Sequence, residues 1–97
     1  MIQPGDRVIV RGTDSSPFVG TFVSADARRV ALTDARRIYR WEGAATLSQL
    51  AQTGTSEPAS CLWPEAVDRV EILDAVEILK VTDAAHSTHQ QVPVWKS

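Results

Sequence analysis

Hydrophobic and polar residues alternate through much of the first forty positions, a pattern typical of β-strands with one buried face. The stretch "PGDRVIVRG" follows a turn signal with an alternating run that places Val8 and Val10 on one face and Ile9 on the other. Residues 18–25, "FVGTFVSA", are rich in β-branched and aromatic residues, which favours a second strand. Gly20 interrupts this run and predicts a bulge or a close approach of two backbones.

Two further short runs follow, "RVALTD" at residues 29–34 and "RRIYRW" at residues 36–41, separated by a predicted turn near Asp34-Ala35. Four short strands joined by tight turns predict an antiparallel meander. We therefore expect a single domain, residues 1–97, that is mainly β with one or two short helices (α+β). The expected architecture is a small antiparallel, SH3-like barrel or a strongly bent sheet.

The clearest helix signal in the chain is a capping box, "TLSQ", that begins at Thr46. In this motif the Thr46 hydroxyl accepts a hydrogen bond from the amide of Gln49, and the Gln49 side chain reaches back toward Thr46. Leu50 supplies part of an apolar side, and Gly54 is a natural helix stop. The pattern predicts a helix of about two turns over residues 47–53.

The sequence "VEIL" occurs twice, at residues 70–73 and 76–79. A helix would put residues six apart on opposite sides, whereas two strands joined at Asp74-Ala75 would give both repeats the same role. The β-branched content also favours two strands, although a helix remains the alternative for residues 67–82. The tail predicts one helical turn and then an extended "VPVW" (92–95) whose apolar residues pack back on the domain.

Composition places the chain among ordinary globular proteins, with 43% hydrophobic and 23% charged residues. No apolar run reaches the ~20 residues of a membrane-spanning helix, so no membrane association is expected. The N-terminus lacks the layout of a signal peptide, and the single cysteine, Cys61, fits a reducing compartment. An intracellular protein is therefore expected.

Charge is distributed unevenly along the chain, although the net charge is only −2. Residues 1–42 hold seven arginines and five acidic residues, whereas residues 43–97 hold three basic and seven acidic residues. This asymmetry is compatible with head-to-tail association, hence a homo-oligomer, or with a local anion site. The negative total argues against a general nucleic-acid coat.

Arginines and aromatic residues gather between residues 36 and 41, just before the predicted helix. In a strand, Arg37, Tyr39 and Trp41 share one face, which forms a stacking platform beside a positive charge. Free amides at the start of the helix suit an anion. The candidate ligand-binding residues are Arg36, Arg37, Tyr39, Arg40, Trp41 and Ser48. The alternative is that the two aromatic residues are core residues covered by arginine stems.

Motifs for catalysis or metal binding are missing from the sequence. There is no P-loop, no dinucleotide-binding fingerprint and no nucleophile elbow. His86 and His89 are adjacent on a helix but lack a further set of ligands apart from Asp83, and Cys61 has no base nearby in sequence. We therefore predict no enzyme, no catalytic residue, no metal and no cofactor.

The segment "LTDARRIYRWEGAATLSQLAQTG" at residues 32–54 resembles a small bacteriophage-encoded family of unknown function. The family carries an A-R-R motif, an aromatic-rich stretch and then W-x-G-A-x-[ST]-L-S-Q-L-A. The resemblance extends to "GDRVIVR", "VEILDAVEILKVTDAA" and "VPVWK". It implies a phage or prophage origin and a small non-enzymatic accessory protein, which would act in the cytoplasm of the bacterial host.

Three functions are compatible with these observations. The first is a counter-defence protein that sequesters a small anionic, nucleotide-like ligand without catalysis. The second is an inhibitor of a host protein, which would use the same arginine and aromatic surface as interface anchors. The third is a structural or nucleic-acid-associated barrel, which the negative net charge disfavours.

Overall fold

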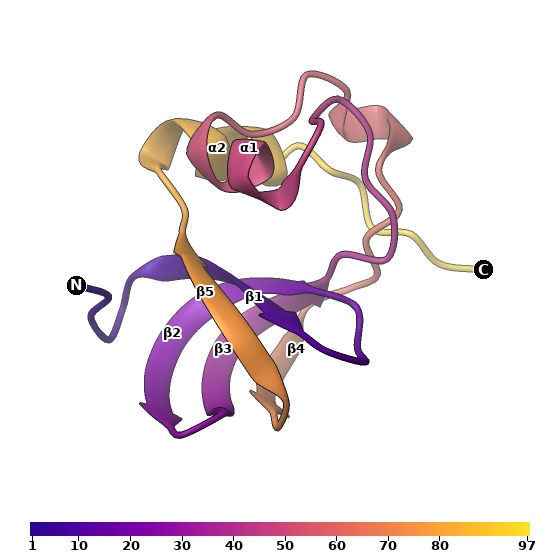
Figure 1. Ribbon diagram of the computed structural model, residues 1–97. Helices are drawn as coiled ribbons and strands as arrows, with labels where there is room; N and C mark the ends of the chain where they lie inside the picture. Colours follow the sequence, from indigo (N-terminus) through magenta and orange to yellow (C-terminus); the bar gives the residue numbers. More distant parts are fainter.

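The computed structural model describes residues 1–97 and consists of one five-stranded antiparallel sheet with two short helices at one end (Figure 1). The elements are β1 (Arg7–Gly12), β2 (Phe18–Asp26), β3 (Arg29–Arg37), α1 (Leu47–Gln52), the 3₁₀ turn η1 (Pro58–Ser60), β4 (Val67–Ile72), β5 (Ala75–Lys80) and α2 (Asp83–His89). The strand order is β4-β3-β2-β1-β5. The prediction of a mainly β, α+β domain is confirmed.

The sheet is strongly bent. Strands β4 and β5 lie at its opposite edges, yet only Leu73 and Asp74 connect them. The amide of Ala75 donates to the Arg28 carbonyl oxygen (3.0 Å), and Asp74 Oδ2 accepts from the amide of Asp14 (2.8 Å), so the connection is tied to both neighbouring loops. The edges meet at this end without pairing, and the result is a bent sheet rather than a closed barrel.

The two "VEIL" repeats form separate strands, as their spacing predicts. They do not pair with each other, because β4 pairs with β3 and β5 pairs with β1. The helical alternative for residues 67–82 is therefore wrong.

The turn expected near Asp34-Ala35 is instead a bulge within β3. Asp34 has a φ of 48°, and the register between β2 and β3 shifts there, opposite Gly20. A Cβ on Gly20 would lie 3.0 Å from the Cβ of Ala35, which confirms the predicted close approach. Asparagine and aspartate tolerate this backbone conformation better than most residues. Asp34, which suggests a turn in the sequence, therefore bends β3 without ending it.

The predicted strand over residues 36–41 is wrong beyond Arg37. Arg37 pairs with Phe18, which is the first residue of β2, and the preceding Pro17 has no N–H with which to extend the ladder. The Ile38 amide still donates to the Pro17 carbonyl oxygen (2.7 Å), after which the chain leaves the sheet. Only an isolated bridge between Arg40 and Leu62 follows.

Two hydrophobic clusters lie on the two faces of the sheet. Val8 and Val10 belong to a cluster of nine buried residues drawn from all five strands, so the bend encloses it. Ile9, on the other face as predicted, belongs to a cluster of ten that joins the sheet to both helices and to the fully buried Trp63. The expected inward packing of the tail is confirmed for Val92, which is buried in this second cluster.

Both helices begin at threonine caps. Thr46 Oγ1 accepts from the amide of Gln49 (3.1 Å), as predicted, but the Gln49 side chain returns to the amide of Ala45 (2.9 Å) rather than to Thr46. Thr82 caps α2 by accepting from the amide of Ala85 (3.1 Å). Helix α2 contains seven residues, about two turns where one was expected. Neither helix is long and apolar enough to cross a membrane.

Gly54 holds the end of α1 against α2, and its replacement by alanine is expected to lower the free energy of unfolding by about 2 kcal/mol. Its φ is +88°, and an added Cβ would overlap Thr88 Oγ1 and lie 3.1 Å from the Ala85 Cα. Gly5→Ala is the matched control, because Gly5 also has a positive φ (+96°) but faces open space. Urea unfolding should show a loss of about 1 kcal/mol there. Equal losses would mean that α2 moves aside freely.

Candidate functional site

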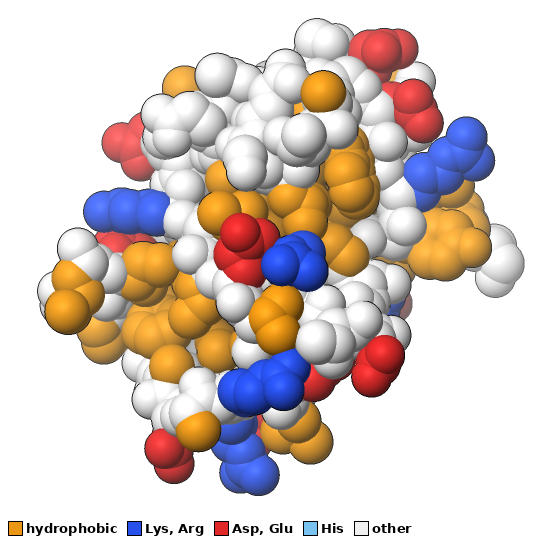
Figure 2. All heavy atoms as spheres, viewed as in Figure 1, with side chains coloured by type: hydrophobic (Ala, Val, Ile, Leu, Met, Phe, Trp, Pro, Cys, Tyr) orange, Lys and Arg blue, Asp and Glu red, His pale blue; other side chains and the backbone are white.

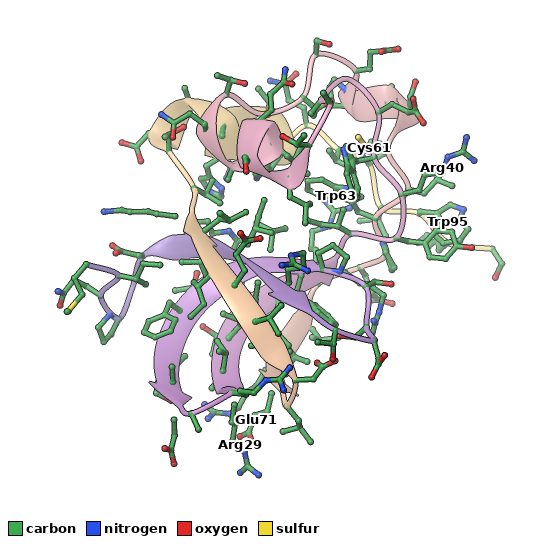
Figure 3. All side chains as sticks on the ribbon, viewed as in Figure 1. Arg29, Arg40, Cys61, Trp63, Glu71 and Trp95 are labelled. Atoms are coloured by element: carbon green, nitrogen blue, oxygen red, sulfur yellow. The ribbon has the colours of Figure 1, made fainter.

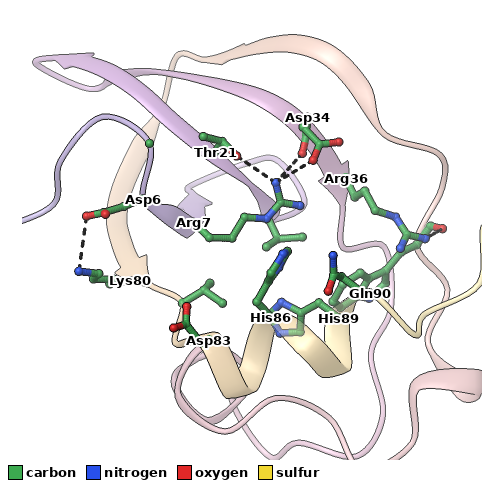
Figure 4. A pocket seen from close by; sticks show the side chains of 14 residues that line it. Asp6, Arg7, Thr21, Asp34, Arg36, Lys80, Asp83, His86, His89 and Gln90 are labelled. Carbon is green, nitrogen blue, oxygen red and sulfur yellow. Dashed lines mark hydrogen bonds and ion pairs between the residues drawn. The ribbon is translucent and has the colours of Figure 1, made fainter.

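A cavity of about 680 Å³ lies between the sheet and α2 (Figure 4). Its volume is typical of small-molecule sites, which range from about 300 to 1,000 Å³. Most of its lining is polar and comes from β1, β2, β3, β5 and α2. The polar side chains in the lining are Asp6, Arg7, Thr21, Asp34, Arg36, Lys80, Asp83, His86, His89 and Gln90.

Arg7 occupies the centre of this cavity in Figure 4. It lies on the same face of β1 as Ile9, which is the face toward the helices. One terminal nitrogen donates to Thr21 Oγ1 (3.3 Å), to the Asp34 carbonyl oxygen (2.9 Å) and to Asp34 Oδ2 (3.2 Å), whereas Nε is buried and has no partner. Burial lowers the pKa of Arg7, and the Asp34 carboxylate opposes that change. The side chain remains a cation with unused donor capacity.

The charges in the lining are balanced. The cations are Arg7, Arg36 and Lys80, and the carboxylates are Asp6, Asp34 and Asp83. Lys80 Nζ is 3.6 Å from Asp6 Oδ2, and Arg7 pairs with Asp34. A complementary ligand therefore carries an anionic group together with hydrogen-bond donors such as hydroxyls or amines.

Arg36 mainly holds the fold together. Its guanidinium donates to four carbonyl oxygens, those of Trp63 (2.8 Å), Val92 (3.0 Å), Pro93 (3.0 Å) and Pro64 (3.1 Å). Its central carbon also lies 5.5 Å from the centre of the Trp63 ring. Burial, followed by the nearby charge of Arg7, lowers the pKa of Arg36. The side chain thus ties two distant segments to β3 while one part of it lines the cavity.

The inner wall of the cavity includes two buried aromatic rings. The rings of Trp63 and His89 meet edge to face, with centres 5.3 Å apart and an angle of 67°. His89 Nε2 lies 2.8 Å from the Leu50 carbonyl oxygen, and burial lowers the pKa of His89 to about 4. The lowered pKa keeps the ring neutral near pH 7, and because a carbonyl only accepts, the single ring proton is on Nε2. Its Nδ1 and the Nε1 of Trp63 have no partner.

The structure does not bring the six sequence-predicted residues together in one site. Of the six, only Arg36 lines the main cavity. The Arg37 guanidinium lies over the Phe18 ring (4.4 Å) beside a second hollow of about 250 Å³. Ser48 is exposed on α1. Trp41 is partly buried against the helix-side cluster, and its Nε1 donates to the Ala44 carbonyl oxygen (3.1 Å).

Tyr39 is an exposed residue rather than a core residue. It is 58% exposed and stacks on Trp95, which is 43% exposed, with ring centres 4.9 Å apart. Arg40 pairs with Glu42 (3.6 Å) nearby in the chain. Trp95 and Arg40 project from the same side of the molecule in Figure 3, and Figure 2 shows apolar and basic side chains at this place. The expected inward packing of Trp95 is therefore only partial.

Most of the cavity residues were missed by the sequence interpretation. Lys80 reaches the site because β5 pairs with β1, where Val8 lies opposite Lys80. Asp34 reaches it through the bulge in β3. One sequence feature could have identified Arg7 as a site residue, namely the alternation of β1, which places Arg7 on the same face as Ile9. The sequence does not show which elements cover that face.

Comparison with curated proteins and with solved structures gives no significant match. A family model does match the chain, over residues 5–89. This range includes every strand and both helices, together with all residues that line the cavity except Gln90. The protein therefore belongs to the family described as a domain of unknown function (DUF6948).

Proposed function

We propose that this protein is a binding module that sequesters a small anionic, nucleotide-like ligand without catalysis. The observation that carries the proposal is the polar cavity of about 680 Å³, with Arg7 at its centre. A sequestering protein needs affinity and no chemistry. The resemblance of residues 32–54 to a phage-encoded family suggests counter-defence in the bacterial host cytoplasm as its setting.

A nucleotide-like ligand suits the balanced charges of the lining. Its phosphate is complementary to Arg7 and Lys80, because a guanidinium and an ammonium both donate to phosphate oxygens. Its ribose hydroxyls and amino groups are donors for the carboxylates of Asp6, Asp34 or Asp83. A simple inorganic anion would use only the first set, so we expect it to bind more weakly.

Nucleotides are expected to raise the melting temperature of the purified protein. A ligand at about 100 times its Kd adds ~2.7 kcal/mol to the free energy of unfolding, which is several degrees for a domain of this size. Linear and cyclic nucleotides should be screened by thermal shift, with light scattering to determine whether the predicted homo-oligomer forms.

Lys80→Gln should weaken nucleotide binding by about tenfold, since it removes one phosphate donor at the edge of the cavity. Lys96→Gln is the matched control, because it makes the same change of charge at an exposed position outside the cavity. Equal affinities for these two variants, or no shift with any nucleotide at millimolar concentration, would contradict the proposal.

The exposed pair of Tyr39 and Trp95 favours a second candidate, an inhibitor of a host protein. Exposed aromatic residues beside an arginine, here Arg40, are typical anchors of protein interfaces. This candidate predicts that no nucleotide raises the melting temperature, that the protein captures a host protein, and that Trp95→Ala abolishes this capture. The proposed sequestering function predicts the shift and requires no host partner.

A further inference from the structure

We infer that Trp63 and His89 form a subsite for the heterocyclic base of the ligand, at which Trp63 Nε1–H donates to the base and His89 Nδ1 accepts from it. The inference rests on the proposed function, because it assigns the second half of the same ligand. The inference requires a ligand whose ring carries a hydrogen-bond donor next to an acceptor on one edge. Purines and pyrimidines have such an edge.

His89 provides an acceptor of fixed identity. The Leu50 carbonyl oxygen lies 2.8 Å from His89 Nε2 and can only accept, so the proton of the neutral ring is on Nε2. His89 Nδ1 therefore carries a lone pair, and it is buried without a partner. The residue is only 3% exposed, so this tautomer is held by the protein rather than exchanged with solvent.

Trp63 provides a donor beside this acceptor. Its side chain is fully buried, and its Nε1–H has no partner. A buried donor without a partner destabilises the fold, because it has lost its hydrogen bond to water and gained none in return. The two rings are in contact, with centres 5.3 Å apart, and both residues line the cavity, so the unpartnered donor and the unpartnered acceptor belong to neighbouring residues of one lining. A molecule that satisfies both would recover free energy that the unliganded fold forgoes.

The lining places the base subsite and the phosphate donors in different parts of the cavity. Figure 4 places Lys80 and Asp6 at one end, with Gln90 and Arg36 at the other, and Arg7 between them. His89 lies toward the second end. The unpartnered nitrogens are not accessible to solvent, so the base enters after a rotation of side chains in the lining. The exposed Gln90 is one such side chain.

The test uses the indole N–H signals in a ¹H–¹⁵N correlation spectrum, since the chain has three tryptophans. The probes are ADP, GDP, CDP and UDP, compared with ribose 5-phosphate and inorganic pyrophosphate. At least one nucleoside diphosphate is expected to shift the Trp63 indole signal, while both base-free probes leave it in place. The Trp41 indole, bonded to the Ala44 carbonyl, is the internal control.

Trp63→Phe supplies the matching affinity measurement. Phenylalanine retains an aromatic ring but has no N–H, so it should weaken the best nucleoside diphosphate about tenfold and leave pyrophosphate unchanged. If this variant does not fold, the wild-type spectrum still decides, because an unmoved Trp63 signal at saturating nucleotide overturns the inference. Equal affinity for pyrophosphate and nucleotides overturns the base subsite but leaves anion binding intact. Binding of no probe overturns both.

Discussion

Replacing Arg36 by alanine is expected to lower the free energy of unfolding by about 4 kcal/mol and to release the C-terminal segment from the sheet. Four carbonyl oxygens, at residues 63, 64, 92 and 93, would each lose a donor. A hydrogen bond to a charged group contributes about 1.5–3 kcal/mol, and solvent replaces part of it at the exposed carbonyls. The total is therefore below the simple sum but large for a domain of this size.

Arg36→Lys separates the role of hydrogen-bonding shape from the role of charge. An ammonium keeps the positive charge, but it is a point donor and does not span four carbonyl oxygens on two segments. We expect it to recover less than half of the loss. Arg37→Ala is the neighbouring control, because the Arg37 guanidinium only covers the Phe18 ring at 4.4 Å and should contribute about 1 kcal/mol or less.

Urea unfolding would measure all three variants, and the indole N–H signal of Trp95 in a ¹H–¹⁵N correlation spectrum would report release of the tail separately. Trp95 lies at the end of the clamped segment, and its amide donates to the Trp63 carbonyl oxygen (3.0 Å). Equal losses for Arg36→Ala and Arg37→Ala would show that the four hydrogen bonds are not a clamp.

The arginine-rich stretch has a structural role as well as a candidate binding role. The sequence suggests that its arginines contact a ligand, but the guanidinium of Arg36 donates to backbone carbonyl groups of distant segments, which the sequence does not identify. Carbonyl groups at residues 63–64 and 92–93 become its partners only because the chain brings those segments beside β3. An arginine near aromatic residues is therefore as compatible with a buried clamp as with a binding platform.

Local rules predicted the parts of the fold that depend on neighbouring residues. The Thr46 cap, the alternation of Val8 and Ile9, and the close approach at Gly20 each follow from chemistry within a few positions, and each is present. The end of β3 was missed, because it depends on where β2 begins opposite Arg37. Pairing between strands decided that boundary, whereas the composition of residues 38–41 would allow a strand.

The candidate site was harder to predict because its residues meet only through topology. Arg7 and Lys80 lie near each other because β5 returns to pair with β1, and nothing in either local sequence specifies that partner. His86 and His89 are adjacent on a helix, as the sequence predicts, but the sequence offers them no role once a metal site is rejected. The acceptor role of His89 depends on the Leu50 carbonyl, which belongs to a different helix.

Acid should destabilise the protein by about 3 kcal/mol between pH 6.5 and pH 4 through His89 alone. Burial, opposed by the hydrogen bond to Leu50 and aided by His86 and Arg7, lowers the pKa of His89 from 6.5 to about 4. Between these values the unfolded chain binds a proton that the folded chain does not, so the unfolded state gains stability as the pH falls. The contribution is fully present above pH 6.5, and each pKa unit corresponds to about 1.4 kcal/mol.

His89→Gln is expected to flatten this part of the stability profile. The glutamine amide can donate to the Leu50 carbonyl oxygen as the imidazole does, but it does not titrate. His86→Gln is the matched control, because His86 lies one turn earlier on α2 and is more exposed than His89. Carboxylates titrate in all the variants alike, so the difference between profiles isolates the histidine. If His89→Gln and the wild type lose stability in parallel from pH 6.5 to pH 4, His89 already accepts a proton in the folded state, and its fixed acceptor role in the cavity is lost with it.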